Sequence, residues 1–547
     1  MPGYRSILRE EFKGYDSKKL SKDLMAGLTV AAVALPLALA FGISSGADAS
    51  AGLITAIVAG LVITAFSGAF YQISGPTGAM AAVLIPVIAR YELQGVFAAT
   101  MIAGLILLLA GIFRLGKLTS FIPAPVITGF TSGISLIIAL GQIGAFLGIE
   151  TTGETALEKI AGYFEGGTAP NLYAMGIGLF VIALMLFFPK KWNAVIPASL
   201  LGIIAATAIA IFADLPVNTI GEIPRTLLPA ERLKLSGLSL DQIAGLMPPA
   251  FSIAVLGMIE SLLCGASAGR MTGKRLDGNQ ELIAQGLGNL ILPFFGGIPA
   301  TAAIARTSVA IKSGAQTRLT GIFHAVGLLI SMLLLAPVMS AIPLSALSGV
   351  LLVTAWRMNE WAAIQYIFSR KFKGAILKFL VTMLATILFD LAVAILVGVF
   401  VGLVLLAMRL SKNNVSLEII DVGRAGLTDH DLISRYKKTC VIYITGPVIF
   451  TNTQSIEDVA YMVDDRFDTV IFSMRGASHL DVSGAQAMLD VIEGLKKNKM
   501  DVIICGLSQD AKKIFDRSGI TELLGEHSFY WSVDKVLAHN RPHHWHN

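Results

Sequence analysis

The chain has 547 residues, of which 54% are hydrophobic and only 14% are charged, and its mean hydropathy is +0.72. These values exclude an ordinary soluble protein, which has no place for so much apolar surface. A net charge of +5 would suggest nucleic-acid binding in a soluble protein. Here the basic residues lie between apolar stretches, where they set membrane topology, so no nucleic-acid partner is expected.

The N-terminal segment, residues 1–22, mixes basic and acidic side chains and lacks the apolar core of a signal peptide. We expect it to stay on the cytoplasmic side. From about residue 24 to residue 408, apolar stretches of roughly 17–25 residues recur, each long enough to cross about 30 Å of hydrocarbon as a helix. We therefore place a transmembrane domain at residues 23–410.

Charged residues between the apolar stretches differ from one loop to the next. Loops expected on one side carry the basic residues Arg114, Lys117, Lys190, Lys191, Arg270, Lys274, Arg275, Lys312, Arg318, Arg370, Lys371, Lys373, Arg409 and Lys412. Loops expected on the other side carry the acidic residues Glu150, Glu154, Glu158, Glu165, Asp214 and Glu222. The positive-inside rule then predicts an even number of spans, between about ten and fourteen, with both chain ends in the cytoplasm.

Two short segments far apart in the chain share an unusual pattern. Residues 74–79 read Ser-Gly-Pro-Thr-Gly-Ala, residues 297–302 read Gly-Ile-Pro-Ala-Thr-Ala, and each precedes an apolar run. Proline is tolerated in a first helical turn and pushes the preceding residue into extended geometry, so each segment predicts a helix that begins within the membrane. Such a start leaves N–H groups that lipid cannot satisfy and an anion can. The pair predicts a midplane anion site; the alternative is that Gly and Pro only kink two packed helices.

Two charged residues fall inside apolar stretches. Arg306 follows Thr301 in an otherwise neutral run, and a buried arginine is costly unless it is paired or functional; alternatively, its side chain extends to the interface near Lys312. Glu260 lies within residues 254–263, where it pairs with Arg306, binds a cation, carries a proton or forms a purely structural ion pair. Asp390, between two late spans, is expected at the outer interface.

Beyond residue 411 the sequence has the texture of a soluble α/β protein. We expect buried strands at residues 440–450, 468–474 and 501–507, and helices at residues 453–463 and 483–496 and after Ser508. This alternation predicts a small sheet covered by helices. The boundaries are a linker at 411–436, the soluble domain at 437–540 and a tail at 541–547, whose histidines His543, His544 and His546 are expected in a disordered end and not in a metal site.

Other chemistry is not indicated. Cys264, Cys440 and Cys505 show no metal-ligand spacing and are expected to be reduced and structural. No phosphate-binding G-x-x-x-x-G-K-[ST] loop is present, and no nucleophile and base pair stands out. We expect neither ATP-driven transport nor an enzyme, and no cofactor.

Taken together and in this order, the motifs resemble the sulfate permease (SulP) family of anion transporters, and within it most closely the bacterial branch associated with C4-dicarboxylates. The resemblance covers nearly the whole chain. It is carried by Asp23-Leu24-Met25-Ala26-Gly27-Leu28-Thr29-Val30 with Pro36, Ser74-Gly75-Pro76-Thr77, Gly129-Phe130-Thr131-Ser132-Gly133, residues 257–263, residues 279–289 (NQELIAQGLGN) and residues 296–314 (GGIPATAAIARTSVAIKSG).

The soluble part resembles the sulfate transporter and anti-sigma antagonist (STAS) domain through residues 446–450 and 479–484. Signalling members of that family carry a phosphorylated Ser or Thr directly after the Asp of this motif. Val482 stands there in this chain, so that phosphoswitch is not expected, while Ser483 is a candidate cap for the following helix.

The resemblance implies an α-helical polytopic membrane protein with fourteen spans in two inverted seven-span repeats, divided into a core and a gate domain, usually a homodimer, joined to a small cytoplasmic α/β STAS domain. It implies that the third and tenth spans are half-helices whose N-termini face one another and bind the anion. Carried over by motif, the residues that line the site are Gly75, Pro76, Thr77 and Gly78 at one end and Ala300, Thr301, Ala302 and Arg306 at the other, with Glu260 as the coupling acid.

Two departures bear on the substrate and the coupling ion. In the bicarbonate branch the position of Glu260 resembles a sodium ligand beside a threonine, and Cys264 replaces that threonine here, which favours coupling to H+ over Na+. That branch also lacks an arginine at the position of Arg306, which favours sulfate or a C4-dicarboxylate.

We therefore expect an elevator-type, H+-coupled secondary transporter of small anions in the lipid bilayer of the bacterial inner membrane, with cytoplasmic termini. The open alternatives are an Na+-coupled bicarbonate transporter, an uncoupled anion channel, and an anion-sensing receptor that signals through its STAS domain to a cytoplasmic protein partner.

Overall fold

The computed structural model describes residues 4–117, 122–149, 169–189, 197–234, 240–389, 391–410, 414–419 and 438–538. The chain forms two compact units, Met1–Phe400 and Val401–Asn547, and the division falls within helix α18 (Leu391–Leu410). Several expectations lie outside the described residues: those on Glu150, Glu154, Glu158, Glu165, Lys190, Lys191, Asp390, Lys412, most of the linker and the histidine tail.

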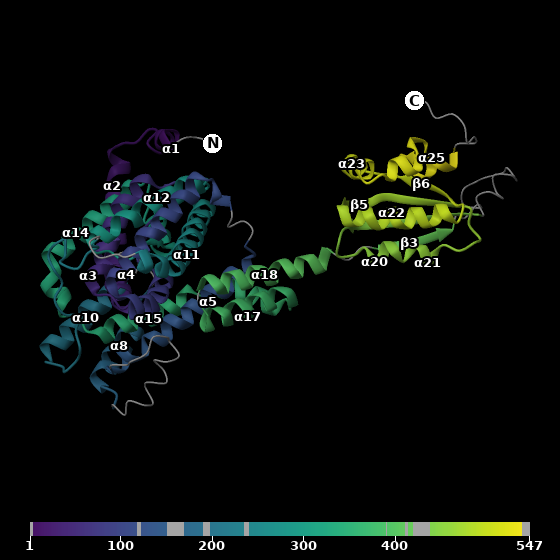
Figure 1. The fold of residues 1–547 in the computed structure, drawn as a ribbon. Coiled ribbons are helices and arrows are strands. Elements are labelled where there is room, and N and C mark those ends of the chain that lie inside the picture. The colour runs from purple at the N-terminus through teal and green to yellow at the C-terminus, as the bar shows by residue number, and fades with distance from the viewer. Residues whose placement is uncertain are drawn as a thin grey trace. The chain divides into compact units, whose positions relative to one another are not determined.

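The first unit is a bundle of apolar helices (Figure 1). Within the described ranges, six helical stretches have the length and composition to cross a membrane: α2 (Ser17–Ser44), α3 (Ala49–Phe66), α4 (Gly78–Ile112), α5 with α6 (Ala124–Gly141 and Ile143–Leu147), α11 (Leu240–Thr272) and α14 (Leu319–Ser340). Shorter apolar helices are α8 (Leu172–Phe187), α10 (Ala198–Phe212), α15 (Leu344–Met358) and α18. Their outer surface carries large apolar side chains such as Phe187 and Phe212, 84% and 90% exposed, which suits lipid better than water.

The helices of this unit pack in two groups. We call α2, α3, α4, α11, α12 (Gly278–Ile291), α13 (Ile304–Lys312) and α14 the core bundle, because each packs mainly against the others. We call α5, α6, α8, α10, α15 and α17 (Lys373–Leu388) the flanking bundle. The two groups meet mainly where α2 contacts α10 and α15 and where α4 contacts α5.

Two helices of the core bundle begin in its interior. The residue Glu92, with φ 55° and ψ −174°, divides α4 into two helical segments, the first of which starts at Gly78. The nine residues of α13 span only about 13 Å at 1.5 Å per residue, too short to cross a bilayer. Both starts are preceded by two-residue strands, β1 (Ser74–Gly75) and β2 (Thr301–Ala302). The predicted interruptions therefore exist in both segments.

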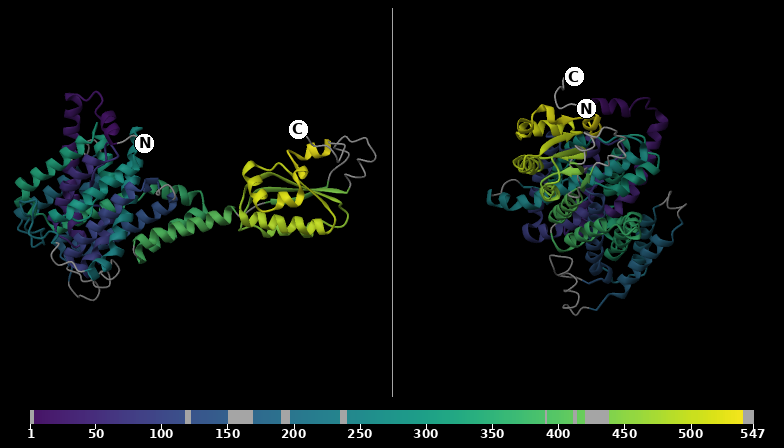
Figure 2. Two further views of the ribbon diagram at one scale, coloured as in Figure 1. Left: turned by 45° about the horizontal axis from the view of Figure 1, so that its top comes forward. Right: turned by 90° about the vertical axis from the view of Figure 1, so that its right-hand side faces the viewer.

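The amphipathic helix α1 (Tyr4–Glu11) lies at one end of the core bundle (Figures 1 and 2). Glu11 Oε2 lies 2.7 Å from Arg318 Nη2, at the start of α14, and both side chains are almost fully buried. Glu10 forms a second ion pair with Lys274 at 3.1 Å, but both of these side chains are exposed. The tyrosine hydroxyl of Tyr4 donates to the carbonyl of Ala65, which ties α1 to the end of α3.

The second unit contains a five-stranded sheet, which confirms the expected α/β domain. Its strands are, in spatial order, β3 (Asn414–Ile419), β4 (Thr439–Val448), β5 (Thr469–Leu480), β6 (Asp501–Cys505) and β7 (Phe529–Tyr530); β3 is antiparallel to β4 and the other pairs are parallel. Its helices are α20 (Gln454–Glu457), α21 (Val459–Met462), α22 (Val482–Lys497), α23 (Gln509–Arg517), α24 (Ile520–Leu524) and α25 (Val533–Ala538). The period of two along β4 sends Ile442 to the main core and Val441 to the face that α25 covers.

Three details of this unit correct the sequence analysis. The range 411–436, expected as a linker, contains strand β3, whose alternating Val415 and Leu417 pack on the core and were an available signal. The helix expected at residues 453–463 is two short helices, α20 and α21. The cap of α22 is Asp481, whose side chain accepts from Gly484 N at 2.8 Å; Ser483 lies inside the helix.

Candidate functional site

The two interrupted segments cross in the interior of the core bundle. Ser74 pairs with Ala302 and Gly75 with Thr301 in an antiparallel register. The contact continues on one side, where Ala303 N donates to Ile73 O at 2.9 Å. The structure therefore brings together two segments more than two hundred residues apart, as the pattern of the sequence predicted. We call the paired strands and the two helix starts that follow them the crossing.

Arg306 lies in the first turns of α13 and is 1% exposed. Its Nη2 donates to the carbonyl of Pro76, and its Nη1 has no hydrogen-bond partner among the described residues. A Cβ atom at Gly75 would lie 2.5 Å from Nη1, so a side chain there would displace the guanidinium from its present position. Arg306 therefore points into the crossing, and the alternative in which it extends to the interface near Lys312 is wrong.

Glu260, on α11, joins the two segments through hydroxyl groups. Its Oε2 accepts from Thr77 Oγ1 at 2.9 Å and from Thr301 Oγ1 at 2.5 Å, and the two threonine hydroxyls are 3.3 Å apart. Its side chain remains partly exposed. The described part of the chain contains no ion pair between Glu260 and Arg306, so this predicted alternative is not what the structure shows.

The helix starts differ in how their N–H groups are used. The Thr77 hydroxyl caps α4 by accepting from Met80 N at 3.3 Å, and among described residues the N–H groups of Gly78 and Ala79 have no partner. Helix α13 begins after Ala303 without a side-chain cap. Ile304 and Ala305, its first two residues, are exposed. Both helix starts thus keep donors that a ligand can engage.

Two of the predicted site residues have their backbone groups occupied elsewhere. Ala300 N donates to Asn289 Oδ1 at 2.8 Å and Ala300 O accepts from Asn289 Nδ2 at 2.9 Å. Ala302 N donates to Ser261 Oγ at 3.2 Å. Ala300 and Ala302 therefore lie at the crossing, but these N–H groups hold the protein together. The open donors belong instead to residues such as Ile304, which the sequence analysis did not name.

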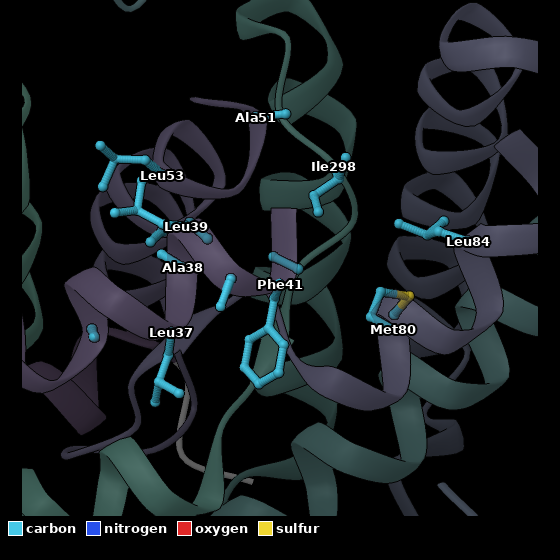
Figure 3. Close-up of a cluster of buried hydrophobic side chains, with 14 of the residues drawn as sticks. Leu37, Ala38, Leu39, Phe41, Ala51, Leu53, Met80, Leu84 and Ile298 are labelled. Carbon is cyan, nitrogen blue, oxygen red and sulfur yellow. The ribbon is translucent and has the colours of Figure 1, made fainter. Parts of the chain in front are cut away.

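Apolar side chains surround the start of α4. Phe41 of α2, Met80 and Leu84 of α4, and Ile298 on the approach to β2 belong to one cluster of buried apolar side chains (Figure 3). A Cβ atom at Gly78 would collide with Ile138 of α5 and lie 3.1 Å from Phe41. Because α5 belongs to the flanking bundle, the start of α4 lies where the two bundles meet.

A separate cavity of about 160 Å³ lies within the flanking bundle. Its walls are formed by Ala145, Gly148, Ile149, Ala174, Asn218, Leu344 and Ser345. None of the predicted site residues lines it, so it is not the anion site at the crossing.

Two residues that hold the crossing from the side of α12 were not among those predicted from the sequence. Gln285 and Asn289 on α12 contact both segments, and the signal was present in the motif NQELIAQGLGN, whose polar residues recur every fourth position of an apolar helix. No cluster of three or more His, Cys, Asp or Glu arranged for a metal occurs in the ranges that the structure describes.

Comparisons with known proteins agree with this architecture. Residues 20–384 match the sulfate permease family, and residues 432–536 match the STAS domain. Over 542 residues the chain is 34% identical to the putative sulfate transporter YvdB of Bacillus subtilis, covering 96% of this chain and 99% of that one. It is 31% identical over 521 residues to the bicarbonate transporter BicA of Picosynechococcus, covering 91% of each chain.

Among solved structures, the murine anion transporter Slc26a9 in its inward-facing state superposes with a TM-score of 0.84, covering 97% of this chain and 93% of that one. The identity is only 17%, so this likeness shows the fold alone.

Proposed function

The chain belongs to the sulfate permease family of anion transporters, and from that premise we propose that it is an elevator-type secondary transporter that carries sulfate or a C4-dicarboxylate together with a proton. Its relatives are named as transporters, in agreement with the expectation that it is not an enzyme. The sulfate and bicarbonate named for relatives belong to those proteins; the anion carried by this chain is part of the proposal.

The buried guanidinium at the crossing carries the proposal. Arg306 contributes a full positive charge and an Nη1 that has no partner among the described residues. The two helix starts each add roughly half a positive charge, with N–H groups that no described residue engages. An isolated buried charge is costly, and a bound anion would compensate it while satisfying the open donors. A neutral or cationic solute would not compensate the charge of Arg306 in this way.

Glu260 is suited to carry the proton. Both of its partners are hydroxyl groups, Thr77 and Thr301, and a hydroxyl can donate to a carboxylate or accept from a carboxylic acid. Glu260 can therefore change protonation state without losing either hydrogen bond. Protonation removes a negative charge beside the anion site, so anion and proton favour one another.

A sodium-coupled mechanism finds less support. Cys264 occupies the place where the bicarbonate branch has a threonine, and its thiol donates to Thr307 Oγ1 at 3.3 Å. Hard cations prefer oxygen ligands, and a thiol is a poor substitute.

The division into bundles supports an elevator movement. The core bundle contains both strands of the crossing, Arg306 and Glu260, so it can move as one body against the flanking bundle, which contributes the apolar contact of Ile138. We count α4 as two spans divided at Glu92, which makes its first segment the third span and α13 the tenth of fourteen. We further propose a homodimer in the bacterial inner membrane, with both termini cytoplasmic and the STAS domain as the docking point for a cytoplasmic partner.

The test is binding and uptake by the purified full-length protein. Arg306→Ala removes a hydrogen bond to a charged ligand, worth about 1.5–3 kcal/mol, so the Kd for the transported anion should rise roughly 10- to 150-fold. The matched control Lys312→Ala, at the other end of the same helix, should change the Kd less than about twofold. Equal effects of the two substitutions would contradict the assignment of Arg306 to the site.

The same preparation in proteoliposomes separates the alternatives. Competing uptake of sulfate, succinate and bicarbonate, with a pH gradient or a sodium gradient, identifies anion and coupling ion. Binding without flux would favour a receptor, flux that ignores both gradients would favour a channel, and sodium-driven bicarbonate uptake would favour the function named for BicA.

A further inference from the structure

Helix α12 carries a line of buried polar side chains toward the crossing. Glu281, Gln285 and Asn289 are spaced four residues apart, so they share one face of the helix, and each is at most 1% exposed. Buried polar groups are costly unless they are hydrogen-bonded. The hydrogen bonds of these three residues show how their burial is compensated.

Asn289 acts on β2 as a neighbouring strand would. Its amide accepts from Ala300 N at 2.8 Å and donates to Ala300 O at 2.9 Å, so one side chain satisfies both backbone groups of the residue that precedes β2. Gln285 reaches the other segment, where its Nε2 donates to Ser74 Oγ at 3.0 Å. A single helix therefore holds both strands of the crossing.

Glu281 anchors this line through hydrogen bonds to both of its oxygens. Its Oε1 accepts from Gln72 Nε2 at 3.0 Å and from Gln285 Nε2 at 2.8 Å, and its Oε2 accepts from Gly68 N at 3.1 Å and from Ser67 Oγ at 2.5 Å. Amide N–H groups can only donate, so a proton on Oε1 would face two donors. Four donors therefore hold the Glu281 side chain in one orientation.

The two acids near the crossing thus differ in their hydrogen-bond partners, which their residue type does not reveal. Among the described residues Glu260 accepts only from hydroxyl groups, whereas Glu281 accepts from three N–H groups and one hydroxyl. Glu281 is therefore the more firmly held of the two acids and serves as the anchor of the line.

The helix is also tied closely to α4. A Cβ atom at Gly286 would lie 2.5 Å from Leu108 N, and one at Gly104 would lie 2.6 Å from Leu290 N, so the second segment of α4 and α12 touch backbone to backbone. A two-residue ladder has little stability of its own. Helix α12 contacts both β1 and the residue before β2, so it contributes to the spacing between the two strands.

We infer that Asn289 and Gln285 are positioning residues that fix the separation and register of the two helix starts, so that they control anion affinity without contacting the anion. This inference rests on the proposed function. Two residues that determine the anion affinity then lie on α12, which is outside both broken segments.

The chain supplies matched controls on the same helix. Asn279 and Gln280 repeat the two residue types near the start of α12, where they accept from Gly116 N and donate to Phe66 O, away from the crossing. With sulfate as the probe, calorimetry on the full-length protein in detergent should show at least tenfold weaker binding for Asn289→Ala and Gln285→Ala. Asn279→Ala and Gln280→Ala should remain within about twofold of the wild type.

The outcomes for this inference and for the proposed function are distinct. A wild type that binds neither sulfate nor succinate would overturn the proposed function and the inference with it. Wild-type binding with Asn289→Ala unchanged would overturn the inference alone. Hydrogen exchange supplies a readout without ligand: the amide of Ala300 should exchange faster in Asn289→Ala than in Asn279→Ala, and equal rates would also overturn the inference.

Asn289→Asp separates positioning from general damage to the fold. The aspartate keeps the shape of the asparagine and accepts from Ala300 N, but it can donate to Ala300 O only when protonated. Its sulfate affinity relative to the wild type should therefore improve at least threefold between pH 7 and pH 5, whereas the ratio for Asn289→Ala should stay constant. Using ratios removes the effect of the other charged groups near the crossing, Glu260, Glu281 and Arg306. A constant ratio for Asn289→Asp would overturn the inference.

Discussion

Replacing Glu260 by glutamine tests the coupling mechanism most directly. Glutamine keeps the length of the side chain, and its carbonyl oxygen can still accept from Thr77 and Thr301, so the two segments stay joined. It cannot take up a proton. The change therefore removes the proposed coupling and leaves the anion site with the neutral partner that a protonated Glu260 would present.

The magnitude follows from the proton gradient. One proton per anion links a pH difference of one unit, about 1.36 kcal/mol, to a tenfold accumulation of the anion at zero membrane potential. With the outside more acidic by one pH unit, the wild type should therefore concentrate the anion about tenfold inside. For Glu260→Gln the ratio of internal to external anion concentration should stay near one.

The assay uses proteoliposomes with the membrane potential clamped by potassium and valinomycin. Exchange of labelled for unlabelled anion, which needs no gradient, should persist in Glu260→Gln within a few-fold of the wild type, because the anion site is retained. Glu222→Gln changes an exposed acid on a loop and should behave as the wild type in both measurements. Gradient-driven accumulation by Glu260→Gln equal to the wild type would refute the reasoning.

Two further predictions concern the parts outside the crossing. Glu11→Ala leaves the buried Arg318 without its ion-pair partner and should lower the free energy of unfolding by about 3–5 kcal/mol. The control Glu10→Ala breaks an exposed ion pair worth at most about 1 kcal/mol. Thermal unfolding of the full-length protein in detergent should distinguish the two variants, and similar melting temperatures would contradict the prediction. Burial raises the pKa of the Cys505 thiol from 9.0 to about 12, so iodoacetamide at pH 8 should leave it unmodified until the domain unfolds. Labelling of Cys505 in the folded protein at pH 8 would contradict this prediction. Since the pKa of the thiol is higher in the folded than in the unfolded protein, the stability that the neutral Cys505 contributes is complete below pH 9 and is lost as the pH rises toward 12.

The local sequence pattern was sufficient to predict the class of protein and the positions where its helices are interrupted. Apolar length predicted the membrane bundle, because crossing hydrocarbon requires a long apolar helix wherever it sits in the fold. Proline and glycine predicted the helix starts at Gly78 and near Thr301, because their effect on the backbone is confined to neighbouring residues. Charge in an apolar run singled out Arg306 and Glu260.

In the soluble domain, one strand had a recognisable sequence pattern that was not used, and another was too short to have one. Strand β3 alternates apolar and polar residues and was predictable, but it lies beside a range with no other strand signal. Strand β7 has only two residues, fewer than any periodicity can reveal. Asp481 caps α22 because its backbone is extended where the strand ends, a conformation that the sequence does not display.

Which groups face one another was decided by packing. The chain itself indicated two electropositive helix starts, a buried arginine and a buried acid, each a property of a few neighbouring residues. Only the tertiary structure decided that Glu260 joins Thr77 to Thr301, that Ala300 turns its backbone to Asn289, and that Glu281 is saturated with donors. These partners come from separate helices, and their hydrogen bonds depend on how the helices approach, which periodicity along one segment does not record.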